Sequence, residues 1–346
     1  MLITKIYAFG MNNRFYIFLY CVFILLPSCQ EEVDLSIPQY PSKPVVNCVF
    51  SPDTSFFISL TQSLPTDQNK MIPLYDGTIH LYENDQWIKT IHHNRNGVYI
   101  SNTIAEENCD YTIQVEAPEF ESLTARSKVP EQSPILKMNH FDSVRIDQND
   151  FYLGRIDVTF KDPPGNTNYY ELFICKRIDT SSIILNPEYL PLDFVDSIMM
   201  EHIQYDNSYS MLPLISNDPN VLGNTKHLNT KGSPFDDYSQ ILYFNDRLFD
   251  GKEYTIKINY LPYYYYQGSN QYYLIEKRYF KVYLRSISKD YYVYQQKWSA
   301  YRDYQGAELW KNPADFVRLH SNVENGYGLF VGYSQSVDSI QVIRDY

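Results

Sequence analysis

Apolar and polar side chains alternate with a period of two at many places along this chain. The pattern is clear at residues 56–61, 156–160 and 280–285. Because successive side chains of a β-strand point to opposite faces of the sheet, such alternation is typical of half-buried strands. Tyrosine supports the same interpretation, since 34 of the 346 residues are tyrosine and aromatic side chains fit the pleated surface of a sheet. The sequence therefore predicts a mainly β protein.

An N-terminal immunoglobulin-like β-sandwich is expected at residues 43–130. Its short alternating segments are bounded by Pro, Asn, Asp and Gly, which is typical of antiparallel sandwiches. Pro130 and Pro134 would interrupt sheet pairing and so mark its end. Seven strands are expected, at residues 44–50, 55–62, 77–83, 86–92, 97–101, 110–117 and 121–128.

A larger antiparallel β domain is expected at residues 135–346. It begins with strands at 151–160 and 169–177, joined by a turn rich in Pro, Asn and Gly. A long irregular insertion is expected at 181–240, where turn-forming residues are frequent and no period persists.

One helix is expected near residues 289–302. Ser288 can cap its first turn, and Asp290 lies near the positive end of the helix dipole. Aromatic residues recur at spacings of three and four, which places them on one face of the helix: Tyr291, Tyr294, Trp298 and Tyr301. This stripe either packs on the neighbouring sheet or faces a ligand.

The N-terminal segment resembles the signal peptide of a bacterial lipoprotein. Arg14 precedes a run of 12 apolar residues at 15–26, which is followed by Pro-Ser-Cys. A helix that crosses a bilayer needs about 20 residues, so this run suits export and removal better than permanent insertion. We expect a signal peptide at residues 1–28 and lipidation of Cys29. An ordinary secretory peptide or an anchor helix is the alternative, and either Met1 or Met11 can be the start.

An acidic, proline-containing linker is expected at residues 29–42, beginning with Glu31 and Glu32 after the cysteine. Acidic residues at this place resemble an export signal that directs lipoproteins to the outer face of the outer membrane. The formal net charge of the whole chain is −12, and no basic cluster is present that could neutralise phosphates. We therefore expect membrane attachment through acyl chains such as palmitate, a cell-surface location and no nucleic-acid partner.

Three further cysteines follow the linker: Cys48, Cys109 and Cys175. At most one internal disulfide can form, and a bridge between Cys48 and Cys109 is one possibility in an oxidising compartment. Buried free thiols are the other, because Cys48 and Cys175 lie in strand-like segments. The wide spacing fits no metal knuckle, and we expect neither a metal nor a cofactor.

No catalytic motif is present in the sequence. It contains no Gly-x-Ser-x-Gly elbow, no His-Glu-x-x-His and no calcium loop of alternating acids. The acidic pairs at 147–150 and 236–237 fit solvated turns better than the paired carboxylates of a glycosidase. We therefore do not expect an enzyme.

A tyrosine-rich run at residues 260–273 is the candidate binding surface. Tyrosine combines a rigid apolar ring with a polar tip, which suits protein interfaces and the stacking of sugars. Consecutive tyrosines cannot all face one core, so some are expected at the surface unless a second layer covers the strand. The residues proposed for this surface are Tyr263, Tyr264, Tyr265, Tyr266, Tyr272 and Tyr273.

Several segments together resemble Bacteroidota outer-membrane lipoproteins of the domain-of-unknown-function family 4249. They are the Ser-Cys lipobox with its acidic flank, KPVVNCVFSPD from Lys43, FKDPPGNTNYYEL from Phe160, SKDYYVY from Ser288 and SNVENGYGLF from Ser321. The resemblance implies a non-catalytic surface lipoprotein that assists a TonB-dependent transporter in nutrient capture. An independent glycan- or peptide-binding lipoprotein, or a structural or assembly component of the envelope, is the alternative.

Overall fold

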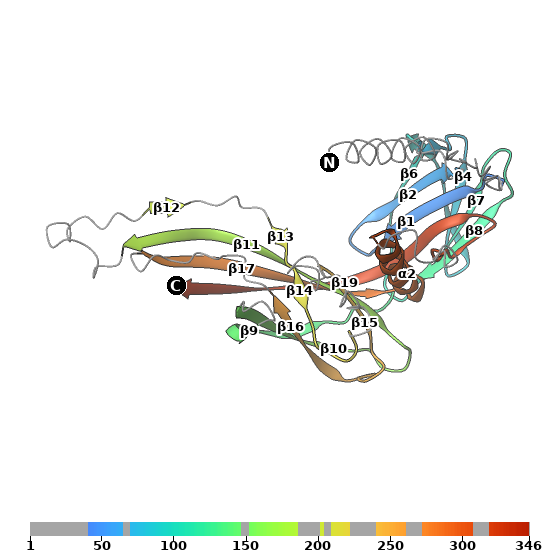
Figure 1. Ribbon diagram of the computed structural model, residues 1–346. Helices are drawn as coiled ribbons and strands as arrows, with labels where there is room; N and C mark the ends of the chain where they lie inside the picture. The colour runs from blue at the N-terminus through green and yellow to red at the C-terminus, as the bar shows by residue number, and fades with distance from the viewer. Residues whose placement is uncertain are drawn as a thin grey trace, which may run out of the picture. The chain divides into compact units, whose positions relative to one another are not determined.

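A computed structural model describes residues 41–64, 70–146, 152–185, 201–203, 209–221, 240–260, 272–306 and 318–345. Within it, residues 42–346 form one compact unit. The described residues are mainly strands with a single helix (Figure 1), which confirms the predicted fold class. None of the helices in the described ranges is long and apolar enough to cross a membrane.

The first β-sandwich follows the local alternation of the sequence closely. In β1 the side chains alternate between buried and more exposed positions, as the period of two predicts. Rings from three strands meet in its core, where Phe50 lies 4.7 Å from Phe56 and 5.5 Å from Tyr111 between ring centroids. Its main strands are β1 (Pro44–Phe50), β2 (Ser55–Gln62), β4 (Thr78–Glu83), β5 (Gln86–Arg95), β6 (Val98–Ile104), β7 (Asp110–Glu116) and β8 (Leu123–Lys128), and the short β3 (Ile72–Pro73) pairs with β2.

The end of the chain completes this first sandwich. Strand β19 (Tyr327–Asp345) runs parallel to β1 over its first residues, and β18 (Val323–Glu324) pairs with β8. Phe330 of β19 enters the core 4.6 Å from Phe50. Pairing between segments so far apart in the chain leaves no local pattern in the sequence, so the partners of β1 and β8 could not be expected from it.

A second hydrophobic core lies between two antiparallel layers. One layer is a four-stranded sheet of β14 (Leu214–Ile215), β16 (Glu253–Tyr260), β10 (Tyr152–Lys161) and β9 (Ile135–Ile146). The other is built on β11 (Tyr169–Leu185), β17 (Tyr272–Ile287) and the rest of β19, with the short strands β12 (Glu201–Ile203), β13 (Ser210–Met211) and β15 (Leu242–Asn245) paired to β11.

The division into two domains stays a prediction. There are two separate cores among the described residues, and the first includes Val323 and Phe330 from beyond the expected boundary. Both cores belong to the single unit 42–346. Strand β19 is shared, since it pairs with β1 and then with β17. In the expected insertion, residues 181–185 extend strand β11, while 186–200, 204–208 and 222–239 lie outside the described residues.

Helix α2 (Lys289–Gly306) begins where its cap was expected. The backbone N–H of Tyr291 donates to Ser288 Oγ at 3.4 Å. Tyr291 and the neighbouring Tyr292 are buried against Leu329 and Val331. The aromatic stripe then continues to the surface, because Trp298 stacks between Tyr294 and Tyr301 but remains 37 % exposed.

Candidate functional site

The four-stranded sheet carries polar residues on the face that turns away from the second core. Alternation along β10 directs Ile156 and Val158 into the core and leaves Arg155, Asp157 and Thr159 on the other face. Along β16, Ile256 and Ile258 face the core, and Thr255, Lys257 and Asn259 lie on the other face. In the antiparallel register, Arg155 pairs with Asn259, Asp157 with Lys257, and Thr159 with Thr255.

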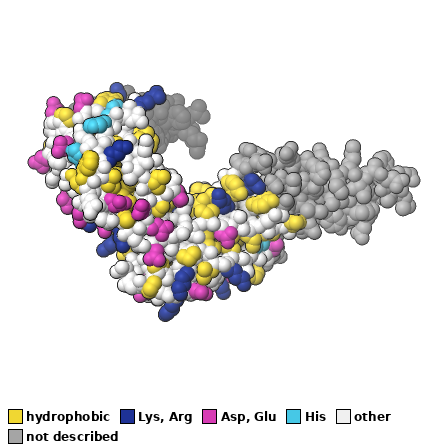
Figure 2. Space-filling view, turned by 180° about the vertical axis from the view of Figure 1, so that it is seen from behind, with side chains coloured by type: hydrophobic (Ala, Val, Ile, Leu, Met, Phe, Trp, Pro, Cys, Tyr) yellow, Lys and Arg dark blue, Asp and Glu magenta, His cyan; other side chains and the backbone are white. Residues whose placement is uncertain are grey.

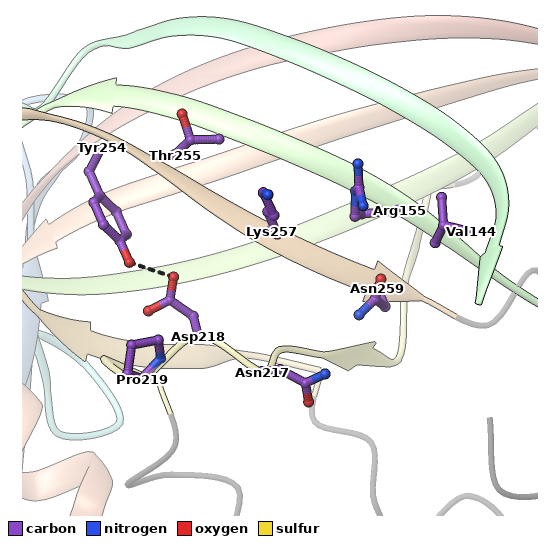
Figure 3. Close-up of a pocket in the computed structure, with 9 residues that line it drawn as sticks. All are labelled: Val144, Arg155, Asn217, Asp218, Pro219, Tyr254, Thr255, Lys257 and Asn259. Atoms are coloured by element: carbon purple, nitrogen blue, oxygen red, sulfur yellow. Dashed lines mark hydrogen bonds between the residues drawn. The ribbon is translucent and has the colours of Figure 1, made fainter. Parts of the chain in front are cut away.

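A pocket of about 450 Å³ lies on this polar face (Figure 3). This volume is within the range of small-molecule sites, about 300–1,000 Å³. The loop at residues 217–219 forms one wall, and the two central strands form the floor. We call it the sheet pocket; its lining residues are Val144, Arg155, Asn217, Asp218, Pro219, Tyr254, Thr255, Lys257 and Asn259.

Hydrogen bonds hold the loop wall of the sheet pocket in place. Tyr254 Oη donates to Asp218 Oδ2 at 2.7 Å, and the backbone N–H of Asn220 donates to Asp218 Oδ1 at 2.9 Å. The Tyr254 ring stacks on Phe249 with a centroid separation of 4.1 Å. Burial, together with the neighbouring Asp218 carboxylate, raises the pKa of Tyr254 to about 12. Tyr254 therefore stays a neutral hydrogen-bond donor across the physiological range.

The floor of the sheet pocket combines charged and amide groups. Arg155 Nε lies 2.8 Å from Asp157 Oδ1, and its guanidinium lies 4.4 Å from the centroid of the Phe141 ring. Among the described residues, Lys257 has no carboxylate within salt-bridge distance. Asn259 is only 8 % exposed, and within the described part of the chain its side-chain amide makes no hydrogen bond.

A family model described as a domain of unknown function (DUF4249) matches residues 30–339, which include all the residues lining the sheet pocket. The chain belongs to the DUF4249 family. The family expected from the sequence is thereby confirmed, and a search of curated proteins gave no match.

This DUF4249 member also brings three carboxylates together beside the second core, at Asp162, Asp246 and Asp250. Asp162 accepts hydrogen bonds from the Tyr170 hydroxyl and, at 2.7 Å, from the backbone N–H of Gly251. Burial raises the pKa of Asp162 and of Asp246, and the Asp250 carboxylate raises both further. Such oxygen atoms suit Ca²⁺, but their contacts already serve to join two turns, so the fold alone explains the group.

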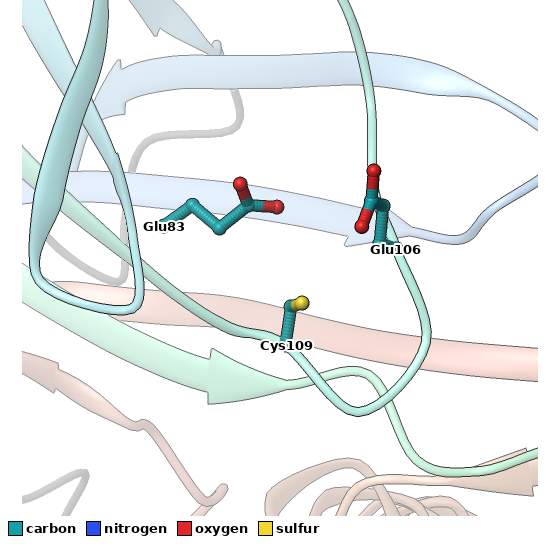
Figure 4. Close-up of side chains that lie close together, drawn as sticks. All are labelled: Glu83, Glu106 and Cys109. Atoms are coloured by element: carbon teal, nitrogen blue, oxygen red, sulfur yellow. The ribbon is translucent and has the colours of Figure 1, made fainter.

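A second group, Glu83, Glu106 and Cys109, lies at one end of the first sandwich (Figure 4). The Tyr111 hydroxyl donates to Glu83 Oε1 and accepts from the backbone N–H of Glu106 at 2.8 Å. The side chain of Asn84 donates to Cys109 Sγ at 3.5 Å. These bonds tie the 83–85 turn to the 106–110 loop, which gives the group a structural role. Cys48, Cys109 and Cys175 are all free thiols in the structure.

The outer face of β11 and β17 alternates aromatic rings with cations. Phe173 stacks on Tyr283 with centroids 4.6 Å apart. The guanidinium of Arg177 lies 4.7 Å from the Tyr279 ring and 5.2 Å from Tyr209. We call this surface the cation–aromatic face; its members are Phe173, Arg177, Tyr209, Tyr279, Lys281 and Tyr283.

The tyrosine surface expected from the sequence is only partly within the described residues. Tyr272 and Tyr273 begin strand β17, where their backbones pair with Leu185 and Ile184 of β11. Tyr263, Tyr264, Tyr265 and Tyr266 lie outside the described residues, as does the expected lipidation site Cys29.

Sequence reasoning missed both the sheet pocket and the cation–aromatic face. The alternation of Arg155, Asp157 and Thr159 was visible as a polar strand face, but nothing local showed that the 217–219 loop covers it. The distribution of charge does not mark either surface, because acidic and basic side chains are interspersed over the face of the DUF4249 unit seen in Figure 2.

Proposed function

We propose that this DUF4249 chain is a non-catalytic lipoprotein anchored to the outer membrane through Cys29, exposed at the cell surface. In this proposal it acts as the accessory subunit of a TonB-dependent transporter in nutrient capture. The observation that carries the anchor is the apolar run at 15–26, ending in Pro-Ser-Cys and followed by Glu31 and Glu32. One acyl chain alone binds membranes only weakly, whereas two or more give stable attachment.

The cation–aromatic face supports the docking part of this proposal. Tyrosine and arginine are enriched at the centres of protein interfaces, where they contribute most of the binding energy. Here they are held in position by strand pairing between β11 and β17 and by contacts such as the one between Arg177 and Tyr279. Tyr209 is 43 % exposed, so a partner can reach it.

Metabolic labelling with palmitate tests the anchor. Cys29→Ala should abolish the label and release the protein from the outer-membrane fraction. Cys175→Ala is the matched control, and it should leave both the label and the location unchanged. Palmitate that remains on the Cys29→Ala protein would contradict the assignment of the anchor.

A pull-down of the tagged full-length protein from outer membranes in mild detergent tests the partner. We expect a TonB-dependent barrel in stoichiometric amount, identified by mass spectrometry. Tyr209→Ala should lower its recovery severalfold, whereas Tyr75→Ala, which removes another exposed tyrosine, should not. Recovery of the lipoprotein without any barrel would contradict the transporter role.

The sheet pocket favours a second candidate function, that of a lipoprotein that binds a glycan or peptide on its own. The observation behind it is the side-chain amide of Asn259, which lines the pocket and has no hydrogen-bond partner among the described residues. Affinity for a ligand in the absence of any barrel would distinguish this function from the first.

A further inference from the structure

Seven of the nine residues that line the sheet pocket carry a polar side-chain group. Such sites are lined mostly by apolar side chains with a few polar groups. Here the lining includes a guanidinium, an ammonium, a carboxylate, two carboxamides and two hydroxyls, beside the apolar surface of Val144, Pro219 and the Tyr254 ring. An apolar ligand would leave these groups without partners, at a cost of about 1–3 kcal/mol for each buried one.

The charges in and around the sheet pocket balance. Arg155 is paired with Asp157, and Asp157 also lies directly across the sheet from Lys257. Asp218 also lines the pocket, where its carboxylate accepts a hydrogen bond from the Tyr254 hydroxyl (Figure 3). Two positive groups therefore accompany two negative groups. An anionic ligand would gain from Lys257 but would be repelled by Asp218, so net charge does not favour it.

Donors and acceptors are mixed in the same small volume. The amides of Asn217 and Asn259 each offer both functions, Lys257 only donates, and Asp218 only accepts. Asp218 Oδ1 already accepts two bonds from Asn220, whereas Oδ2 accepts a single bond from the described residues, that from Tyr254. One lone pair of Oδ2 is thus left for a ligand. A molecule with several hydroxyl groups matches this lining, since each hydroxyl both donates and accepts.

We propose that the sheet pocket binds a neutral saccharide. The amide of Asn259 bonds to adjacent hydroxyls, Lys257 donates to a sugar oxygen, and Asp218 Oδ2 accepts from a hydroxyl. Strand pairing between β10 and β16 fixes the backbone of Asn259 and Lys257 before the ligand arrives, which lowers the ordering cost of binding. This inference deepens the second candidate function and does not depend on the transporter.

The test is isothermal titration of the full-length protein in a detergent without a sugar headgroup. The probes are maltotriose, cellotriose and mannotriose, with trialanine and trigalacturonic acid as competitors of other classes. At least one neutral trisaccharide should bind. Asn259→Ala and Lys257→Ala should each weaken its binding about tenfold, which corresponds to about 1.4 kcal/mol. The matched controls Asn102→Ala and Lys89→Ala, on exposed positions of the first sandwich, should bind like the wild type.

A second variant at Asn259 distinguishes a loss of ligand binding from misfolding of the Asn259→Ala protein. Asn259→Asp keeps the shape of the side chain but removes its donor, so it should retain the wild-type melting temperature and still lose affinity. The proposal is overturned if none of the neutral trisaccharides binds, if only trialanine or trigalacturonic acid binds, or if the pocket variants bind like the controls. Barrel recovery in the pull-down should be unchanged in all these variants, so failure here is separable from failure of the transporter role.

Discussion

Arg285 Nη1 lies 2.7 Å from Glu171 Oε1, beneath the first turn of helix α2. The Glu171 side chain is only 2 % exposed. The Glu171 carboxylate also lies close to the hydroxyls of Tyr243 and Tyr291. Burial is the main cause that raises the pKa of both hydroxyls, and the negative charge of Glu171 is the next. The ion pair therefore lies where helix α2, β11 and β17 meet.

Removing Glu171 should destabilise the protein strongly. In Glu171→Ala the partly exposed Arg285 would lose its carboxylate partner and keep its hydrogen bond to Gln335. Breaking a buried ion pair typically costs about 3–5 kcal/mol, which is the upper limit for the loss of stability here. The free energy of unfolding, measured in urea by circular dichroism, checks this value. Asp85→Ala is the matched control, because its pair with Arg126 is long, at 3.5 Å, and exposed. A change below about 1 kcal/mol is expected there, and an equally small change for Glu171→Ala would contradict the prediction.

The Asp162, Asp246 and Asp250 group should make stability depend on pH. Burial and mutual repulsion raise the pKa of Asp162 and of Asp246 in the folded state. The folded protein therefore holds extra protons just above the ordinary aspartate pKa of about 3.9. Below that pH, protonation of Asp162 and Asp246 makes its whole contribution to the free energy of unfolding. This contribution is lost as the pH rises through the raised pKa values of the two groups.

Asp250→Asn isolates this effect, since Asp250 is exposed and raises the pKa of both buried neighbours. The variant should gain stability relative to the wild type at pH 7 and gain less at pH 4. Carboxyl carbon NMR titration should show a lower pKa for Asp162 and for Asp246. Asp85→Asn, in the first sandwich, should leave both values unchanged. An unshifted titration in Asp250→Asn would refute the coupling.

Gly328→Ala should disrupt the pairing of β19 with β1. The φ of Gly328 is +112°, and a Cβ atom there would lie 1.9 Å from the backbone oxygen of Val46. Backbone strain and the clash together should cost more than about 3 kcal/mol. Gly165→Ala separates the two causes, because its φ is +105° but nothing lies within 4 Å of its Cβ. Gly165→Ala should lower the free energy of unfolding by about 1 kcal/mol. If thermal melts show the same loss of stability for both variants, the clash with Val46 is not the cause.

The thiol of Cys48 should be unreactive in the folded protein. Cys48 is buried in the first core, and burial raises its pKa to about 12. Iodoacetamide at pH 8, followed by peptide mass spectrometry, should modify Cys109 before Cys48. In urea both should react at similar rates. Rapid modification of Cys48 without denaturant would show that the first core opens readily.

Much of the fold could be predicted because its signals are local. The alternation along β1, β2 and β7 and the Ser288 cap of α2 depend on residues that are neighbours in sequence. The sheet pocket could not be predicted this way. It requires the 217–219 loop to meet strands β10 and β16, and the contact from Tyr254 to Asp218 spans 36 residues. The burial of Tyr292 beside the expected stripe likewise depends on the β19 surface against which it packs.

Strand β19 has a consequence for how the chain is made. Synthesis proceeds from the N-terminus at about 5–20 residues per second, so the last strand appears on the order of tens of seconds after β1. Until then the edge of β1 lacks its parallel neighbour, and the first core lacks Phe330. Contacts between the two ends of a chain form slowly because a long loop must close. A nascent or truncated chain would therefore remain incompletely folded, and proteases or chaperones would recognise it until its last residues are in place.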